Sequence, residues 1–144
     1  MSRATEWADR VTQAFSAPDG AAAFSRCFTE DAVQHHPFFP TPHKGRAEIQ
    51  EAESAMFAGF SDVRMTATRV IDGNDGWITI EWNVVATNTG DLAMPDGNVV
   101  PATGRTVDLK MASVAHLADD GDADEEVRYQ DNLAFLVQLG LVPG

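Results

Sequence analysis

The most constraining feature of this sequence is a change in the spacing of its apolar residues near Asp62. Before that point, apolar side chains recur every three or four residues, which predicts amphipathic helices over residues 3–16, about 19–28 and 45–60. After it, apolar and polar residues alternate, and this pattern indicates strands that bury one face. A chain that is first helical and then extended places its helices on one side of a sheet.

The second half of the chain divides into strands, turns and one short helix. The expected elements are a short extended segment at 32–36, strands at 63–71, 78–87, 107–117 and 126–130, a loop at 90–104, an acidic turn at 119–126, and an apolar helix at 132–139 that ends at Gly140. The strands follow one another as an antiparallel meander, so the predicted fold class is α+β. Helices that close a strongly curved antiparallel sheet form a cone-shaped barrel, and such a cone can hold a ligand.

Length and charge restrict what the protein binds. A chain of 144 residues is typical of one domain, so we expect a single domain over 1–144. The formal net charge of −12 argues against nucleic acid and anionic membranes as partners, because both attract positive charge. No run approaches the roughly 18–20 apolar residues of a membrane span, and the N-terminus lacks the apolar core of a signal peptide. We therefore expect a cytoplasmic protein whose single cysteine, Cys27, is a buried structural thiol.

The stretch VRYQDNLAFLVQLG, residues 127–140, places Asp131 where a strand gives way to a helix. Aspartate is a preferred helix N-cap, and a carboxylate that accepts backbone N–H bonds is a poor base. Alternatively, Val127, Tyr129 and Asp131 share one face if the extended backbone runs that far, and an apolar pocket on that face would favour a general acid/base. The residues by themselves leave both alternatives open.

Three histidines, His35, His36 and His43, lie close together in HHPFFPTPH. Imidazole is a common metal ligand, but this spacing matches no usual zinc pattern and the prolines prevent two ligands from sharing a helix face. We therefore predict no metal site. His35 shares its strand face with Val33 and is expected to line a pocket, whereas His36 and His43 are expected at the surface or in the loop.

Five motifs occur in an order that resembles one family. They read DAVQHHPFFPTPHKGRAEI, FAGFSDVRM, WITIEWNVVATNTGDL, ATGRTV and RYQDNLAFLVQLGLVP, and together they extend over nearly the whole chain. The sequence thereby resembles the SnoaL-like polyketide cyclases of the nuclear transport factor 2-like superfamily. Members of that superfamily are cone-shaped α+β barrels, so the resemblance implies the fold class that the periodicity also predicts.

The resemblance also implies an activity. Characterised members close a ring of an aromatic polyketide by an intramolecular aldol condensation, without a metal or an organic cofactor, and they are usually dimers or tetramers. For this chain it implies a small hydrophobic or aromatic substrate, no cofactor, and a homo-oligomer. It further implies that Asp131 is the catalytic acid/base and that His35 assists it. On this basis we expect Asp131→Asn to keep the fold and to abolish activity.

The sequence departs from the family pattern at two positions. Asn88 stands where the family often has a histidine, and Ser113 lies near a second position of that kind. Asparagine can donate a hydrogen bond to a carbonyl group but cannot transfer a proton near neutral pH. Asn88, Ser113 and Tyr129 are therefore expected to bind substrate. Trp82 and Phe15 are expected to line the hollow core beside them.

Two other functions are compatible with the sequence. Superfamily relatives include hydroxylases, hydrolases and isomerases, and an epoxide hydrolase of the known kind needs an Asp-Arg-Asp set that activates water. Asp131 and Arg69 alone do not make such a set. The other alternative is a domain that binds a ligand without catalysis, which the missing histidines favour. Fold alone does not decide between these functions.

Overall fold

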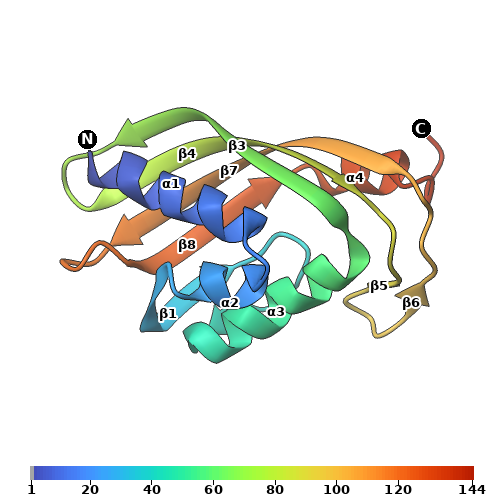
Figure 1. Ribbon diagram of the computed structural model, residues 1–144, viewed down its shortest axis with the longest axis horizontal. Helices are drawn as coiled ribbons and strands as arrows, with labels where there is room; N and C mark the ends of the chain where they lie inside the picture. Colours follow the sequence, from blue (N-terminus) through green and yellow to red (C-terminus); the bar gives the residue numbers. More distant parts are fainter. Residues whose placement is uncertain (1) are drawn as a thin grey trace.

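The computed structural model describes residues 2–144 (Figure 1). The helices are α1 (Arg3–Ser16), α2 (Gly20–Ser25), α3 (Gly45–Gly59) and α4 (Asn132–Gln138). The strands are β1 (Phe28–His35), β2 (His43–Lys44), β3 (Ser61–Asp72), β4 (Trp77–Thr87), β5 (Leu92–Ala93), β6 (Val99–Val100), β7 (Thr106–Leu117) and β8 (Ala123–Gln130). Among the helices of residues 2–144, none has the length and apolar character that crossing a membrane requires.

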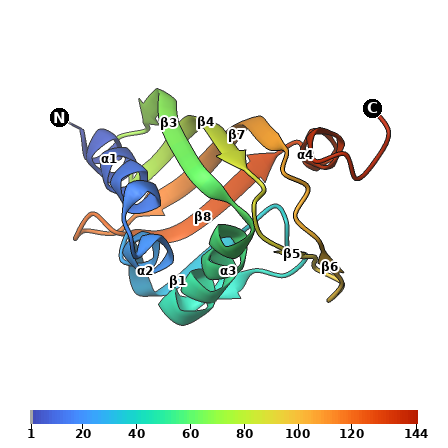
Figure 2. The ribbon, with the colours of Figure 1, turned by 45° about the vertical axis from the view of Figure 1, so that its right-hand side comes forward.

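Six of the strands form one sheet in the order β2-β1-β8-β7-β4-β3. Neighbours from β3 to β8 are antiparallel, as the meander predicts, whereas β1 runs parallel to β8. The strands β5 and β6 pair only with each other, in the long loop between β4 and β7. Figures 1 and 2 show α1, α2 and α3 on one side of the curved sheet, with α4 at the end far from the N-terminus. The predicted α+β class, with helices closing a curved sheet, is confirmed.

The interior between helices and sheet is filled by two buried clusters. The larger cluster includes Trp7, Phe24, Phe28, Ile80 and Trp82. The smaller cluster includes Phe38, Leu92, Val107, Phe135 and Leu139. Full burial of one such apolar side chain contributes roughly 1.5–3 kcal/mol to stability, so these residues supply much of the driving force for folding.

Three predicted boundaries are wrong, and all three lie where β1 pairs with β8. The helix expected to reach about residue 28 ends at Ser25, and the extended segment expected at 32–36 begins at Phe28. The expected acidic turn at 119–126 is shorter, because β8 already begins at Ala123. Phe28 and Ala123 are partners in this parallel pair. Local periodicity does not reveal a contact between segments so far apart in the chain.

Cys27 is a buried free thiol, as expected. Burial raises the pKa of this thiol to about 11, because an apolar environment disfavours the thiolate. The thiolate is the nucleophilic form of cysteine, so Cys27 is unreactive near neutral pH.

Candidate functional site

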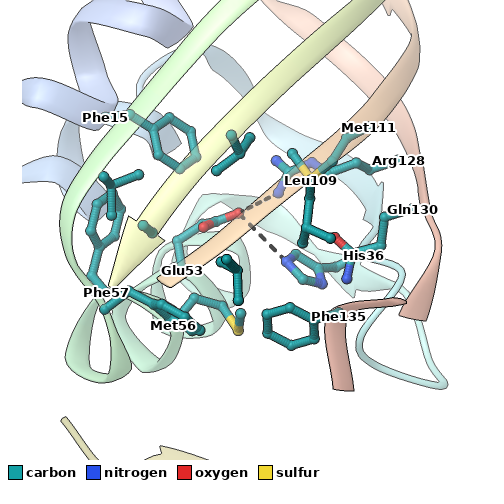
Figure 3. Close-up of a pocket in the computed structure, with 15 residues that line it drawn as sticks. Phe15, His36, Glu53, Met56, Phe57, Leu109, Met111, Arg128, Gln130 and Phe135 are labelled. Carbon is teal, nitrogen blue, oxygen red and sulfur yellow. Dashed lines mark hydrogen bonds and ion pairs between the residues drawn. The ribbon is translucent and has the colours of Figure 1, made fainter. Parts of the chain in front are cut away.

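A cavity of about 80 Å³ lies between α3, the inner face of the sheet and α4 (Figure 3). Apolar side chains from α1, α3, α4 and three strands form most of its walls. The polar side chains that line it are His36, Glu53, Arg128 and Gln130. Pockets for drug-sized ligands are about 300–1,000 Å³. The cavity therefore suits a small molecule, and a polycyclic one requires the aromatic and methionine side chains of the wall to move.

Glu53 lies on the buried face of α3. Ile49, Ala52 and Glu53 are buried, and Met56 follows at the next helical position of the same stripe. Glutamate is almost never fully buried unless it is paired. The apolar stripe predicts core residues, and its carboxylate was not among the predicted site residues. The signal was present in the sequence as an acidic residue in register with the apolar stripe.

The Glu53 carboxylate lies between the Arg128 guanidinium and the His36 imidazole (Figure 3). Arg128 Nη1 donates to Glu53 Oε1 at 3.1 Å, and His36 Nε2 lies 3.9 Å from the same oxygen. The Glu53 side chain is only 2% exposed, and burial raises its pKa above the ordinary value because it disfavours the charged form. The nearby Arg128 charge opposes this rise without cancelling it. Glu53 is therefore a stronger base than an exposed glutamate, as catalysis of proton transfer near neutral pH requires.

Arg128 is shared by two buried carboxylates. Its Nη1 donates to Glu53 and its Nη2 donates to Glu126 Oε1 at 3.4 Å. Burial disfavours the guanidinium charge, but the attraction of Glu126 and Glu53 outweighs this cost and raises the pKa of Arg128. Arg128 thus remains a cation inside the protein, with two acids for its single charge.

One backbone hydrogen bond assigns the tautomer of the neutral His36 ring. The backbone N–H of Phe38 donates to His36 Nδ1 at 3.1 Å, so Nδ1 is an acceptor and the ring proton lies on Nε2. Burial lowers the pKa of His36 well below its usual value, and the charges of Arg128 and His43 lower it further. The separation of 3.9 Å between Nε2 and Glu53 exceeds hydrogen-bond distance. The Nε2–H is therefore free to donate to a ligand.

Asp131 lies outside this cavity, which corrects its expected placement. Its side chain is exposed, and its Oδ1 accepts the backbone N–H of Ala134 at 3.0 Å as the N-cap of α4. The helix begins at Asn132, directly after β8. Along β8 the inward face carries the even-numbered Glu126, Arg128 and Gln130, so Asp131 lies on the opposite side, where the free N–H groups of α4 bind its carboxylate.

We expect Asp131→Ala to lower the free energy of unfolding by about 1 kcal/mol, because it removes the N-cap acceptor. Asp131→Asn keeps an acceptor oxygen and is expected to cost less. Urea denaturation monitored by circular dichroism measures both values. Neither substitution touches the cavity, so ligand binding there should persist. Loss of all activity in a folded Asp131→Asn variant would restore the catalytic role that the family resemblance implies.

The histidines are also placed differently from the expectation. His35 is exposed, while Ala32 and Gln34 on the same strand are buried and His36 lines the cavity. The inward face of β1 thus carries the even-numbered residues, and a shift of one residue moves a side chain to the opposite face of a strand.

His43 packs against Phe39 and His36. Within residues 2–144, no three His, Cys, Asp or Glu side chains converge to hold a metal ion.

Asn88 is a structural residue rather than a cavity residue. It is 1% exposed, and its Nδ2 donates to the carbonyl oxygens of Gly59 and Gly90 at 2.8 and 3.0 Å. Its Oδ1 accepts both the backbone N–H and the hydroxyl of Thr103. The amide is fully used in joining three chain segments, which corrects its expected role in substrate binding.

The remaining residues predicted to bind substrate divide into three groups. Phe15 lines the cavity. Trp82 and Ser113 are 1% and 0% exposed, and they bond to each other behind the cavity, with Trp82 Nε1 donating to Ser113 Oγ at 2.9 Å. Tyr129 is 58% exposed, because it alternates with the inward-facing Arg128 on β8. The expectation that Tyr129 and Asp131 share a pocket face is therefore corrected.

Known structures share this fold over almost the entire chain. A candidate SnoaL-like polyketide cyclase from a Jannaschia species superposes with a TM-score of 0.79 at 17% identity, covering 98% of this chain and 94% of its own. A protein with a ketosteroid isomerase-like fold from Catenulispora acidiphila gives a TM-score of 0.78 at 17% identity, covering 95% of this chain and 94% of its own. IdmH from Streptomyces antibioticus, a candidate polyketide cyclase, gives 0.76 at 22% identity, covering 96% and 99%. Identities this low establish the fold alone.

The comparison of sequences identifies the family. No curated protein matches the chain. The model of the SnoaL-like domain matches residues 8–125, which run from within α1 to the first residues of β8 and include the cavity residues His36 and Glu53. The fold, with its helices on a curved and mostly antiparallel sheet, agrees with that match. The chain therefore belongs to the SnoaL-like domain family.

Proposed function

We propose that the protein is a cyclase-type acid/base enzyme that acts, without a cofactor, on a small hydrophobic polyketide-like substrate. The observation that carries this proposal is the buried Glu53 carboxylate in an apolar cavity, beside the neutral His36 donor and the Arg128 cation. A base of raised proton affinity next to hydrogen-bond donors is the arrangement that enolate chemistry needs. The family resemblance favours a cyclase among the enzymes that use such chemistry.

The reaction would begin with transfer of a proton from a carbon next to a carbonyl group to Glu53. The C–H electron pair forms an enolate, and the His36 Nε2–H and the Arg128 guanidinium stabilise the charge on its oxygen. The enolate carbon then attacks a second carbonyl carbon of the same molecule, which forms a C–C bond and an alkoxide. Glu53 returns its proton to that alkoxide, so the enzyme ends as it began and no oxidant or reductant is required.

The test is the exchange of α-protons of a simple ketone for deuterium. Cyclohexanone is small, apolar and carries one carbonyl group. We expect the protein in D₂O to accelerate its exchange, followed by ¹H NMR, above the rate in matched buffer. The rate should rise with pH as Glu53 loses its proton, at a higher pH than for an ordinary glutamate. No acceleration with either cyclohexanone or the larger 2-tetralone would contradict the proposal.

A hydrolase that activates water is a second candidate, favoured by one specific observation. Glu53, Arg128 and Glu126 form a carboxylate–guanidinium–carboxylate series at the cavity. Asp131 and Arg69 do not form such a set, and Arg69 pairs with Glu81 on the protein surface. Incubation with cyclohexene oxide in H₂¹⁸O distinguishes the two functions. Incorporation of ¹⁸O into a diol, without ketone exchange, would favour the hydrolase.

The predicted homo-oligomeric state remains a prediction. Light scattering coupled to size exclusion measures the molar mass directly. A mass equal to that of one 15.6 kDa chain would contradict it.

A further inference from the structure

A series of hydrogen bonds crosses the interior behind the cavity. The indole Nε1–H of Trp82 donates to Ser113 Oγ at 2.9 Å, and the Ser113 hydroxyl donates to Glu126 Oε2 at 2.7 Å. The side-chain amide of Gln34 donates to Glu126 Oε1 at 2.9 Å. An indole N–H can only donate, so the Ser113 oxygen accepts from Trp82 and the Ser113 hydroxyl donates its own hydrogen bond to Glu126. These bonds join β1, β4, β7 and β8.

The series ends at the candidate acid/base. Glu126 Oε1 also accepts Arg128 Nη2 at 3.4 Å, and Arg128 Nη1 reaches Glu53 at 3.1 Å. The side chains of Glu126, Arg128 and Glu53 are 1%, 4% and 2% exposed. Glu126 accepts hydrogen bonds from Gln34, Ser113 and Arg128, whereas Glu53 accepts one from Arg128 at 3.1 Å and also interacts with the Gln34 amide. Both carboxylate oxygens of Glu126 accept hydrogen bonds, and burial favours the protonated form of Glu53.

Stability alone does not account for this arrangement. Replacing a buried ion pair or triad by packed apolar side chains is often neutral or stabilising, because charges lose their hydration on burial. Here two acids and one guanidinium lie beside an apolar cavity, although apolar residues would fill the same space. A role at the cavity explains why they are arranged in this way.

We propose that Glu126 is a positioning residue that controls, through Arg128, the ability of Glu53 to exchange protons, and that Ser113 and Trp82 hold Glu126 in place. This inference rests on the proposed function, because it takes Glu53 as the reacting group. Glu126 acts in two ways: it draws the Arg128 charge away from Glu53, and its own negative charge disfavours a second anion nearby. Both effects keep a proton on Glu53 to higher pH.

The groups that face Glu53 are few. Arg128 and Glu126 approach it from β8, and the uncharged Gln34 amide approaches from β1; His36 approaches from the end of β1, with His43 behind it. His36 is neutral over most of the accessible pH range because its pKa is lowered. The charge of Glu126 is therefore the one that a single substitution can remove without touching Glu53 or its direct donor.

The test is an NMR titration of the full chain labelled with ¹³C at the glutamate carboxyl groups. Glu53 is assigned by the signal that is lost in Glu53→Gln. We expect Glu126→Gln to lower the titration midpoint of Glu53 by about 1–2 pH units, because the Arg128 charge then stabilises the Glu53 anion without a competing carboxylate. Glu125→Gln is the matched control, since it removes the same charge from the neighbouring residue of β8. It should leave the midpoint unchanged.

Ser113→Ala provides a second variant that deletes only one oxygen atom, in case Glu126→Gln does not fold. Without the Ser113 donor, Glu126 is expected to draw Arg128 closer and to raise the Glu53 midpoint. A residue with only a structural role would lower stability and leave the midpoint in place. An unchanged midpoint in the folded variants, or an equal shift in Glu125→Gln, would overturn the proposal. Because the titration needs no substrate, its outcome is independent of the ketone exchange assay.

Discussion

Glu53→Gln is expected to lower the rate of cyclohexanone exchange about 10²–10⁴-fold, the usual contribution of a general acid/base. The amide has nearly the same shape as the carboxylate and can still contact Arg128, so we expect the fold to be retained. It cannot accept a proton from carbon near neutral pH. The measurement is the initial rate of deuterium incorporation at equal protein concentration, with circular dichroism as the check of folding.

Glu51→Gln is the matched control for this substitution. Glu51 lies on α3 two residues before Glu53, but on the exposed side of the helix. The chemical change and the change in net charge are the same in both variants, so only the position differs. We expect exchange by Glu51→Gln to equal that of the unmodified protein. Equal rates in Glu53→Gln and Glu51→Gln would show that Glu53 is not the base.

Arg128→Met is expected to have the largest effect on stability. It leaves two buried carboxylates without their cation, and breaking a buried pair in this way costs about 3–5 kcal/mol. The loss should be greatest at alkaline pH. Without Arg128, the folded-state pKa of Glu53 rises further above its unfolded value, so stability is highest at acid pH and is lost as the pH rises through the folded-state pKa. Urea denaturation at about pH 5 and about pH 8 measures this difference.

Two further variants show whether charge causes this loss. Arg64→Met removes an arginine from an exposed position on β3 and is expected to change stability by less than about 0.5 kcal/mol. The double variant Arg128→Met/Glu53→Gln has one buried anion fewer and should regain part of the lost stability at about pH 8. A loss that is the same at both pH values, with no recovery in the double variant, would indicate lost packing rather than unpaired charge.

The placement of β1 illustrates how far sequence reasoning reaches. Its alternation of buried and exposed residues was visible in the sequence, but the choice of inward face was not. Two adjacent histidines offered both choices, and the structure directs His36 inward while His35 is exposed. The inward face is set by pairing with β8, because Val33, Gln34 and His35 are registered against Glu125, Glu126 and Val127. The same pairing directs Glu126 and Arg128 into the interior.

Asp131 shows the converse case. Its role as an N-cap follows from local chemistry, because an aspartate directly before an apolar helical stretch has backbone N–H groups within reach. The alternative, a pocket-facing acid, required the odd-numbered residues of β8 to face inward, with a cavity beneath them. Those are tertiary features, and the structure has neither at this position.

The sequence by itself determined the order of the longer helices and strands and the α+β class, and it offered the N-cap as one of two roles for Asp131. Each depends on residues within a few positions of one another, through hydrophobic periodicity and hydrogen bonds to nearby backbone. The candidate site was decided only by the tertiary structure. Glu53 and Arg128 are 75 residues apart and meet because α3 packs over the sheet that contains β8. The acid with the raised pKa could be recognised only from its burial and its partners, since proton affinity depends on the surroundings of a carboxylate and not on its position in the chain.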